Sequence, residues 1–83
     1  MTEPILAELQ GIMRVTFGNP WLPIRMDTVA EDVDGWDSLA HARLIVAVEK
    51  HFGISFPAER LFELTSVGEL VELIAIRQGE SRQ

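Results

Sequence analysis

The stretch that decides the fold is residues 37–53, which read DSLAHARLIVAVEKHFG. Asp37 is a natural N-cap, because its side chain can accept a hydrogen bond from a first-turn N–H group and its charge suits the positive end of a helix. Gly53 is typical of the position just past a helix C-terminus. Between these two residues the apolar side chains recur with the helical period, so we expect a helix from Ser38 to about Phe52.

The segments on both sides of this helix show the same period. Upstream, apolar residues spaced along one helix face predict a helix over about 3–17. Downstream, we expect a short helix over about 57–63 and a longer one over about 67–78, with Ser66 and Glu69 forming a capping box at its start. The fold class is therefore all-α: a small four-helix bundle with three longer helices, one short third helix and a long loop between the first two. The residues expected on the inner faces of the first and last helices are Ile5, Leu9, Ile12, Met13, Val67, Leu70, Val71 and Ile74.

The long loop covers about residues 18–36 and contains several apolar side chains. A connection of this length is unusual in a small domain unless it packs against the core or has a function. We expect Trp21, Leu22 and Ile24 to lie against the core.

Length and composition limit the classes of function. The 83 residues are 47% hydrophobic and 24% charged, so we expect one domain over 1–83 with one modest core. The absence of cysteine excludes disulfides, thiolate metal ligands and a cysteine nucleophile. A net charge of -6 argues against nucleic acid as a partner, because phosphates would be repelled. No apolar run is long enough to cross a membrane, and no secretory signal is evident, so we expect a cytoplasmic monomer.

A hydroxyl at the start of the central helix is the most informative feature of the chain. Ser38 comes directly after the long loop and Asp37, at the first turn of the expected helix. Free backbone N–H groups and the positive end of the helix favour an anion there. A serine carrying a phosphodiester would suit this place. Asp-Ser is also common at helix starts as a simple cap, so these residues alone leave both interpretations open.

The wider sequence resembles the acyl carrier protein family, which includes the carrier domains of polyketide and peptide synthetases. The resemblance rests on Asp37-Ser38-Leu39, the run 44–49, Phe52-Gly53-Ile54, Pro57, and the run 64–67 with Leu70. It implies that Ser38 receives 4′-phosphopantetheine from coenzyme A through a separate phosphopantetheinyl transferase, which brings the magnesium. The thiol of this arm then carries an acyl, aminoacyl or polyketide group as a thioester, and the carrier itself is not an enzyme.

The resemblance also implies partners and flanking residues. Besides the transferase, the partners would be an acyl- or aminoacyl-loading ligase or transferase and downstream biosynthetic enzymes. Trp36, Asp37 and Leu39 would flank the attachment point. His41 and Ile45 lie on the inner side of the helix, where we expect them near the cargo. The alternative for His41 is a partly buried histidine that is bonded to backbone or water. Trp36 and His41 resemble a subset of free-standing carriers in specialised pathways.

The outer face of the same helix is the expected partner surface. Leu39, Arg43, Val46 and Lys50 follow steps of four, three and four, so they form one exposed stripe. In the resembled family this helix is the recognition helix and is usually acidic. Arg43 and Lys50 depart from that pattern, which predicts dedicated partners with an acidic or mixed surface. The alternative is that the two charges only keep the face soluble.

Other classes of function remain as alternatives. Ser38 and His41 share a helix face with Asp37 adjacent, which could suit a hydrolase, but no Gly-x-Ser-x-Gly motif is present and the chain is too short for a substantial cleft. A helical interaction module without a cofactor is a second alternative.

A metal site is the least favoured alternative. His41 and His51 lie about 15 Å apart along the helix, too far to share an ion. The acidic residues of the loop are better interpreted as a solvated segment that complements the helix start; they are Glu31, Asp32, Asp34 and Asp37.

Overall fold

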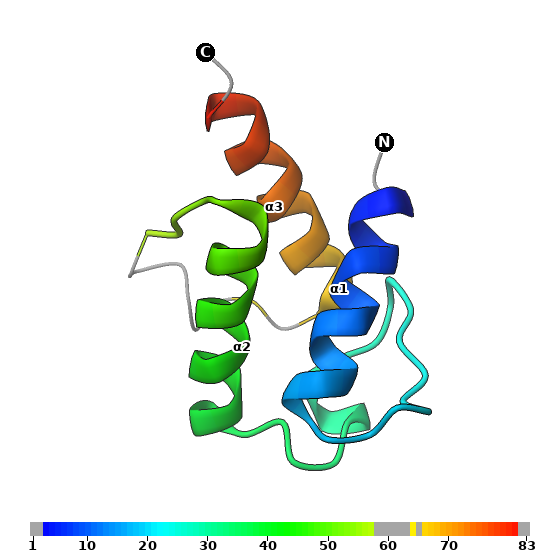
Figure 1. The fold of residues 1–83 in the computed structure, drawn as a ribbon. Coiled ribbons are helices and arrows are strands. Elements are labelled where there is room, and N and C mark those ends of the chain that lie inside the picture. The colour runs from blue at the N-terminus through cyan, green and yellow to red at the C-terminus, as the bar shows by residue number, and fades with distance from the viewer. Residues whose placement is uncertain (1–2, 58–63, 65, 82–83) are drawn as a thin grey trace.

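The structure is a computed structural model that describes residues 3–57, 64 and 66–81 of the chain (Figure 1). The elements are α1 (Glu3–Thr16), the single-turn 3₁₀ helix η1 (Ala30–Asp32), α2 (Ser38–Phe52) and α3 (Val67–Ser81). The predicted all-α class with three main helices is confirmed. Except for Pro57, the short helix expected over 57–63 lies outside the described ranges.

The ends of α2 are those expected from its sequence. One carboxylate oxygen of Asp37 accepts a hydrogen bond from the N–H of Ala40 at 2.9 Å, and Gly53 adopts the left-handed conformation just after the helix. At α3, the Ser66 hydroxyl accepts from the N–H of Glu69 at 3.2 Å, so the expected serine cap is present. The expected end of this helix near residue 78 is wrong, because α3 continues to Ser81. Gly79 lies within the last turn of α3. A glycine costs a helix about 1 kcal/mol relative to alanine, which weakens this turn without ending the helix.

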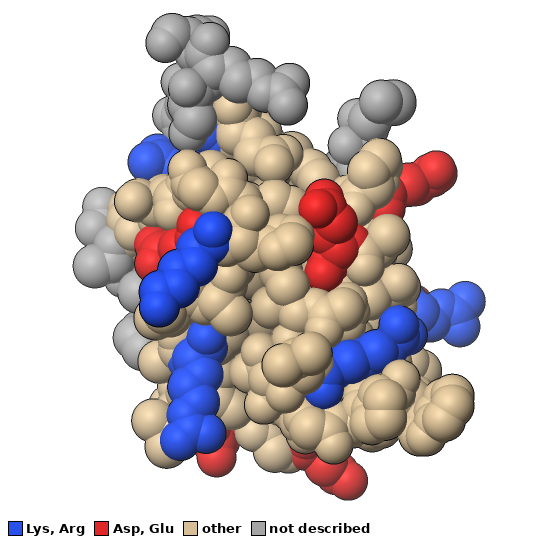
Figure 2. Space-filling view, viewed as in Figure 1, with Lys and Arg blue, Asp and Glu red and all other residues tan. Residues whose placement is uncertain are grey.

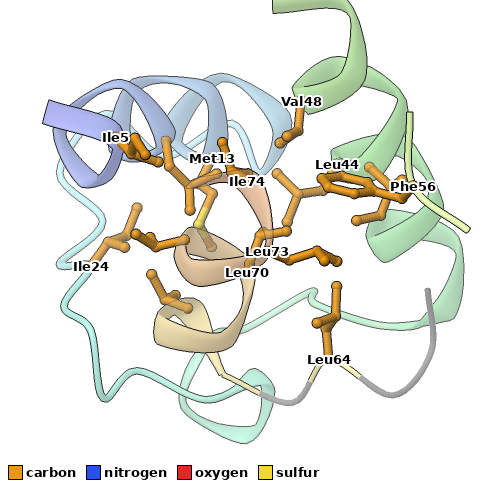
Figure 3. Packing of buried hydrophobic residues seen from close by; sticks show 14 of the residues in the cluster. Ile5, Met13, Ile24, Leu44, Val48, Phe56, Leu64, Leu70, Leu73 and Ile74 are labelled. Carbon is orange, nitrogen blue, oxygen red and sulfur yellow. The ribbon is translucent and has the colours of Figure 1, made fainter. Parts of the chain in front are cut away.

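The core lies between the three helices, with α1 and α2 antiparallel (Figure 1) and side chains from all three meeting at the centre (Figure 3). The largest fully buried side chains are Leu9, Met13, Leu44, Val48, Val67, Leu70, Val71 and Ile74. The inner faces predicted for α1 and α3 are therefore confirmed, except that Ile12 is only partly buried at the edge of the core.

The first half of the long loop packs against α1 as an extended segment. Leu22 and Ile24 are buried, as predicted. Two side chains of α1 bind the backbone of this segment. Arg14 Nε donates to the carbonyl of Leu22 at 3.0 Å, and Gln10 Nε2 donates to the carbonyl of Ile24 at 2.8 Å. The loop therefore has a fixed path even though it has little regular structure of its own.

The prediction that Trp21 lies in the core is wrong, because its side chain is 86% exposed. Successive side chains of an extended segment point to opposite sides. Leu22 and Ile24 point inward, so Trp21 and Pro23 point to solvent. Only one of the two alternating sets can be buried, and the aliphatic pair occupies the inner side.

The second half of the loop is attached to the start of α3. The N–H of Val67 donates to the carbonyl of Thr28 at 2.8 Å, and the N–H of Gly68 donates to that of Met26 at 2.8 Å. A Cβ atom added to Gly68 would lie 2.8 Å from the Met26 carbonyl oxygen, a distance that real Cβ atoms essentially never show. This close approach of two backbones fixes the loop shortly before it reaches α2.

Candidate functional site

A tight turn delivers the chain to the first residue of α2. Gly35 has a φ of 87°, a conformation that favours glycine, and its carbonyl accepts from the N–H of Asp37 at 3.0 Å. The N–H of Trp36, the residue after Gly35, donates to the carbonyl of Val33, whose side chain is buried. The turn therefore places Ser38 as an exposed residue at the N-terminus of α2.

The start of α2 suits a phosphate on the serine oxygen. Asp37 caps the N–H of Ala40, and the geometry of an α-helix leaves the N–H groups of Ser38 and Leu39 without acceptors inside the helix. These two groups and the positive end of the helix dipole can stabilise a negative charge beside the Ser38 hydroxyl. The residues present therefore fit a phosphodiester at this position.

An open pocket of about 250 Å³ lies beside Ser38. Its lining residues are Ala30, Trp36, Asp37, Ser38, His41 and Leu64. Four of the residues predicted to belong to the site therefore come together. Ala30 and Leu64 were missed, because they reach the pocket from η1 and from the segment before α3, and no local pattern in the sequence links these segments to Ser38.

Trp36 and His41 form the polar wall of this pocket. Trp36 Nε1 donates to His41 Nδ1 at 3.0 Å, and the two rings are stacked with centroids 6.1 Å apart. Phe17 also packs against the indole, with a centroid distance of 5.8 Å. His41 is only 6% exposed. An imidazole whose Nδ1 accepts such a bond holds its ring proton on Nε2.

Sequence reasoning missed this hydrogen bond. The available signal was the indole N–H, which usually finds an acceptor when the ring is buried. The bond also bears on the hydrolase alternative, since His41 Nδ1 already accepts the Trp36 N–H.

The structure separates the two residues predicted to contact cargo. His41 lines the pocket, whereas Ile45, one turn further along α2, is 3% exposed in the core and is not among the pocket-lining residues. The contact of Ile45 with cargo stays a prediction.

The predicted outer stripe of α2 is exposed. Leu39 is 63% exposed and Val46 49%, and Arg43 and Lys50 are exposed beside them. Figure 2 shows Lys and Arg side chains lying along α2 on the left of the view.

The acidic residues of the loop show no metal geometry. In the ranges that the structure describes, no three His, Asp or Glu side chains are grouped so that they could hold an ion. His51 contacts Glu8 of α1 at 3.0 Å. Within the same ranges, no helix is long and apolar enough to span a membrane.

Comparisons with known proteins agree with this geometry. A family model described as "Phosphopantetheine attachment site" matches residues 34–74. The acyl carrier protein MbtL of Mycolicibacterium paratuberculosis is 33% identical over 78 residues, covering 94% of this chain and 88% of the relative. The anthracycline acyl carrier protein DpsG of Streptomyces peucetius is 38% identical over 66 residues, covering 77% of this chain and 79% of the relative.

A solved structure shows the same fold. The holo acyl carrier protein from Geobacter metallireducens superposes with a TM-score of 0.86 at 36% identity, covering 94% of this chain and 90% of that one. The chain belongs to the acyl carrier protein family. It is a phosphopantetheine-carrying acyl carrier protein and a non-catalytic carrier, and family membership implies interaction with a phosphopantetheinyl transferase and with pathway enzymes. The hydrolase and the module without a cofactor are thereby set aside.

Proposed function

We propose that Ser38 is the residue that carries phosphopantetheine. The observation that carries the proposal is its exposed hydroxyl at the first residue of α2, beside two backbone N–H groups that have no acceptor within the helix. Two other serines lie within residues 34–74. The Ser66 hydroxyl caps α3, and Ser55 lies beyond the C-terminal end of α2, where the helix dipole disfavours a phosphate.

Attachment makes Ser38 the acceptor in a phosphoryl transfer. The serine oxygen forms a bond to the coenzyme A phosphorus that bears the pantetheine, the bond from that phosphorus to 3′,5′-ADP breaks, and the hydroxyl proton leaves to a base on the transferase. The attached arm supplies the thiol that a chain without cysteine lacks. The N-terminus of α2 then stabilises the negative charge of the phosphodiester next to Asp37 and Leu39.

We further propose that Trp36 and His41 contact the part of the arm or cargo nearest to Ser38. Both line the pocket, and their mutual hydrogen bond holds the two rings in one arrangement. The pocket of about 250 Å³ is smaller than the usual site for a drug-sized ligand. A long acyl chain therefore needs additional space, for which Ile45 on the inner side of α2 is the proposed neighbour.

The partner surface proposed for this carrier is the outer stripe of α2. It begins at Leu39, next to Ser38, so an enzyme docked there finds the arm within reach. The proposed partners beyond the transferase are a loading ligase or transferase and downstream enzymes of a specialised pathway. The single domain over 1–83, the monomeric state and the cytoplasmic location stay predictions.

Intact mass tests the attachment site. After incubation with coenzyme A, magnesium and a broad-specificity phosphopantetheinyl transferase, the protein should gain the mass of one phosphopantetheine. Ser38→Ala should gain none while its circular dichroism stays helical, and the matched control Ser55→Ala should be modified like the original chain. Modification of Ser38→Ala, or a modified peptide that lacks residue 38, contradicts the proposal.

A further inference from the structure

The exposed face of α2 is positively charged although the whole chain is acidic. The chain has a net charge of -6, yet Glu49 is the single carboxylate within α2. That carboxylate is half-buried, and its Oε2 accepts a hydrogen bond from the backbone N–H of Phe56 at 2.8 Å. Glu49 therefore ties the end of α2 to the segment that follows it, and α2 carries two cations, Arg43 and Lys50, for this one carboxylate.

The two cations of the stripe form no ion pair in the described part of the molecule. The ion pair found there joins His51 to Glu8, and neither Arg43 nor Lys50 takes part in one. Both side chains are exposed, and Figure 2 shows the positive side chains along α2. The local charge of this face is thus opposite in sign to the net charge of the chain.

Apolar surface lies between the two cations. Val46 is 49% exposed and separates two shallow hollows, of about 440 Å³ on one side and about 550 Å³ on the other. The first hollow is lined by Ala42, Arg43, Val46, Ala47 and Lys50. The second is lined by Val46, Glu49, Lys50, Gly53, Ile54, Ser55 and Arg77. Val46 and Lys50 belong to both, so each hollow places an apolar side chain beside a cation, and the second hollow also contains the Glu49 carboxylate.

Resting on the proposed carrier function, we propose that the outer stripe of α2 docks a partner protein whose contact surface is apolar at its centre and acidic at its rim. Carboxylates of the partner pair with Arg43 and Lys50, and its apolar side chains occupy the hollows beside Val46. Charge complementarity carries this assignment, because a basic contact surface would meet like charge on the stripe. Nucleic acid does not fit, since its phosphates would also meet the acidic remainder of the chain.

Two synthetic peptides test the chemistry of the partner. Both are amphipathic helices of one length with one leucine pattern, and they carry either glutamate or lysine at the polar positions. Each is titrated into the ¹⁵N-labelled unmodified protein at low salt while the amide shifts are followed. The glutamate peptide should shift the amides between Leu39 and Lys50, although the net charge of the chain alone would favour the lysine peptide.

Single charge reversals with a matched control show which residues bind the glutamate peptide. Arg43→Glu and Lys50→Glu should each weaken binding of the glutamate peptide about threefold to tenfold, as expected when one exposed charge pair is lost and reversed. Arg25→Glu makes the same change of charge at an exposed loop residue away from α2, and it should stay within about twofold. Higher ionic strength should reduce the difference between the variants.

Three outcomes overturn the proposal. The glutamate peptide fails to shift the amides of α2, or Arg25→Glu weakens binding as much as Lys50→Glu, which would assign the effect to net charge. In the third, sedimentation shows a dimer of the free protein that Lys50→Glu dissociates, so that a second copy covers the stripe through its own acidic loop. None of these measurements uses Ser38, so they leave the attachment site to be decided separately by intact mass.

Discussion

At the scale of single residues, Trp36 connects the loop, the core and the site. Its indole packs against Phe17 at the end of α1 and donates its N–H to His41 on α2. The backbone on its C-terminal side leads directly into Asp37 and Ser38. One side chain therefore fixes the position of the pocket wall relative to the start of α2.

Replacing Trp36 by phenylalanine should lower the free energy of unfolding by about 1–3 kcal/mol, because the change removes the donor to a buried imidazole nitrogen. Urea unfolding followed by circular dichroism measures this. Trp21→Phe makes the same chemical change at a residue that is 86% exposed, so it should stay within about 0.5 kcal/mol of the original chain. Equal losses in the two variants would contradict a role for the hydrogen bond.

The two tryptophans also show what single residues reveal before a structure is known. Neither belongs to a periodic segment, so residue type was the main guide, and it placed Trp21 wrongly in the core. Trp21 is exposed because Leu22 and Ile24 occupy the inner side of an extended segment that Gln10 and Arg14 hold from α1. These contacts join residues 8 and 14 positions apart, which local sequence patterns do not encode.

At the scale of elements, helix starts and stripes were predictable and the contacts between segments were not. Asp37 and Gly53 mark the ends of α2 through interactions within a few residues, and the inner stripe of α3 follows from its period alone. The Glu49–Phe56 hydrogen bond and the approach of Gly68 to Met26 depend on how the segments come together. The same holds for Ala30 and Leu64 at the pocket, where the chain returns from distant positions.

A pair of glycine substitutions tests the contact between the loop and α3. Gly68→Ala should destabilise the protein by about 1–3 kcal/mol, because the new Cβ would lie 2.8 Å from a backbone carbonyl oxygen and the two segments would have to separate. Gly11→Ala places its Cβ in open space within α1 and should stabilise by about 0.5–1 kcal/mol. Thermal and urea unfolding of both variants measure the sign of each change in the free energy of unfolding. Stabilisation by Gly68→Ala would show that the close approach is not kept in solution.

At the scale of the whole molecule, the described fold is compact. The Cα radius of gyration is 11.8 Å, and a compact domain of this length has a value of about 12 Å. The molecule exposes both the cations of α2 and the carboxylates of the loop before it, so charge can act between two copies in either sense. The balance between these charges therefore decides whether the free protein is a monomer or a dimer.

We expect the free protein to be monomeric, because a net charge of -6 makes copies repel one another. Light scattering coupled to size-exclusion chromatography should give the mass of one chain at both low and high salt. The double variant Arg43→Glu with Lys50→Glu should give the same mass. A mass of two chains at low salt that falls to one in the double variant would contradict this prediction.

The different surroundings of the two indoles have an optical consequence. The chain contains two tryptophans and no tyrosine, so a Trp21→Phe variant emits from a single indole, which stands two residues before Ser38 and against the His41 ring. Its fluorescence intensity and emission maximum depend on what lies in the adjoining pocket. Attachment of the arm and exchange of its cargo can then be timed by stopped-flow mixing, with an intrinsic probe and without any dye on the carrier or its partners.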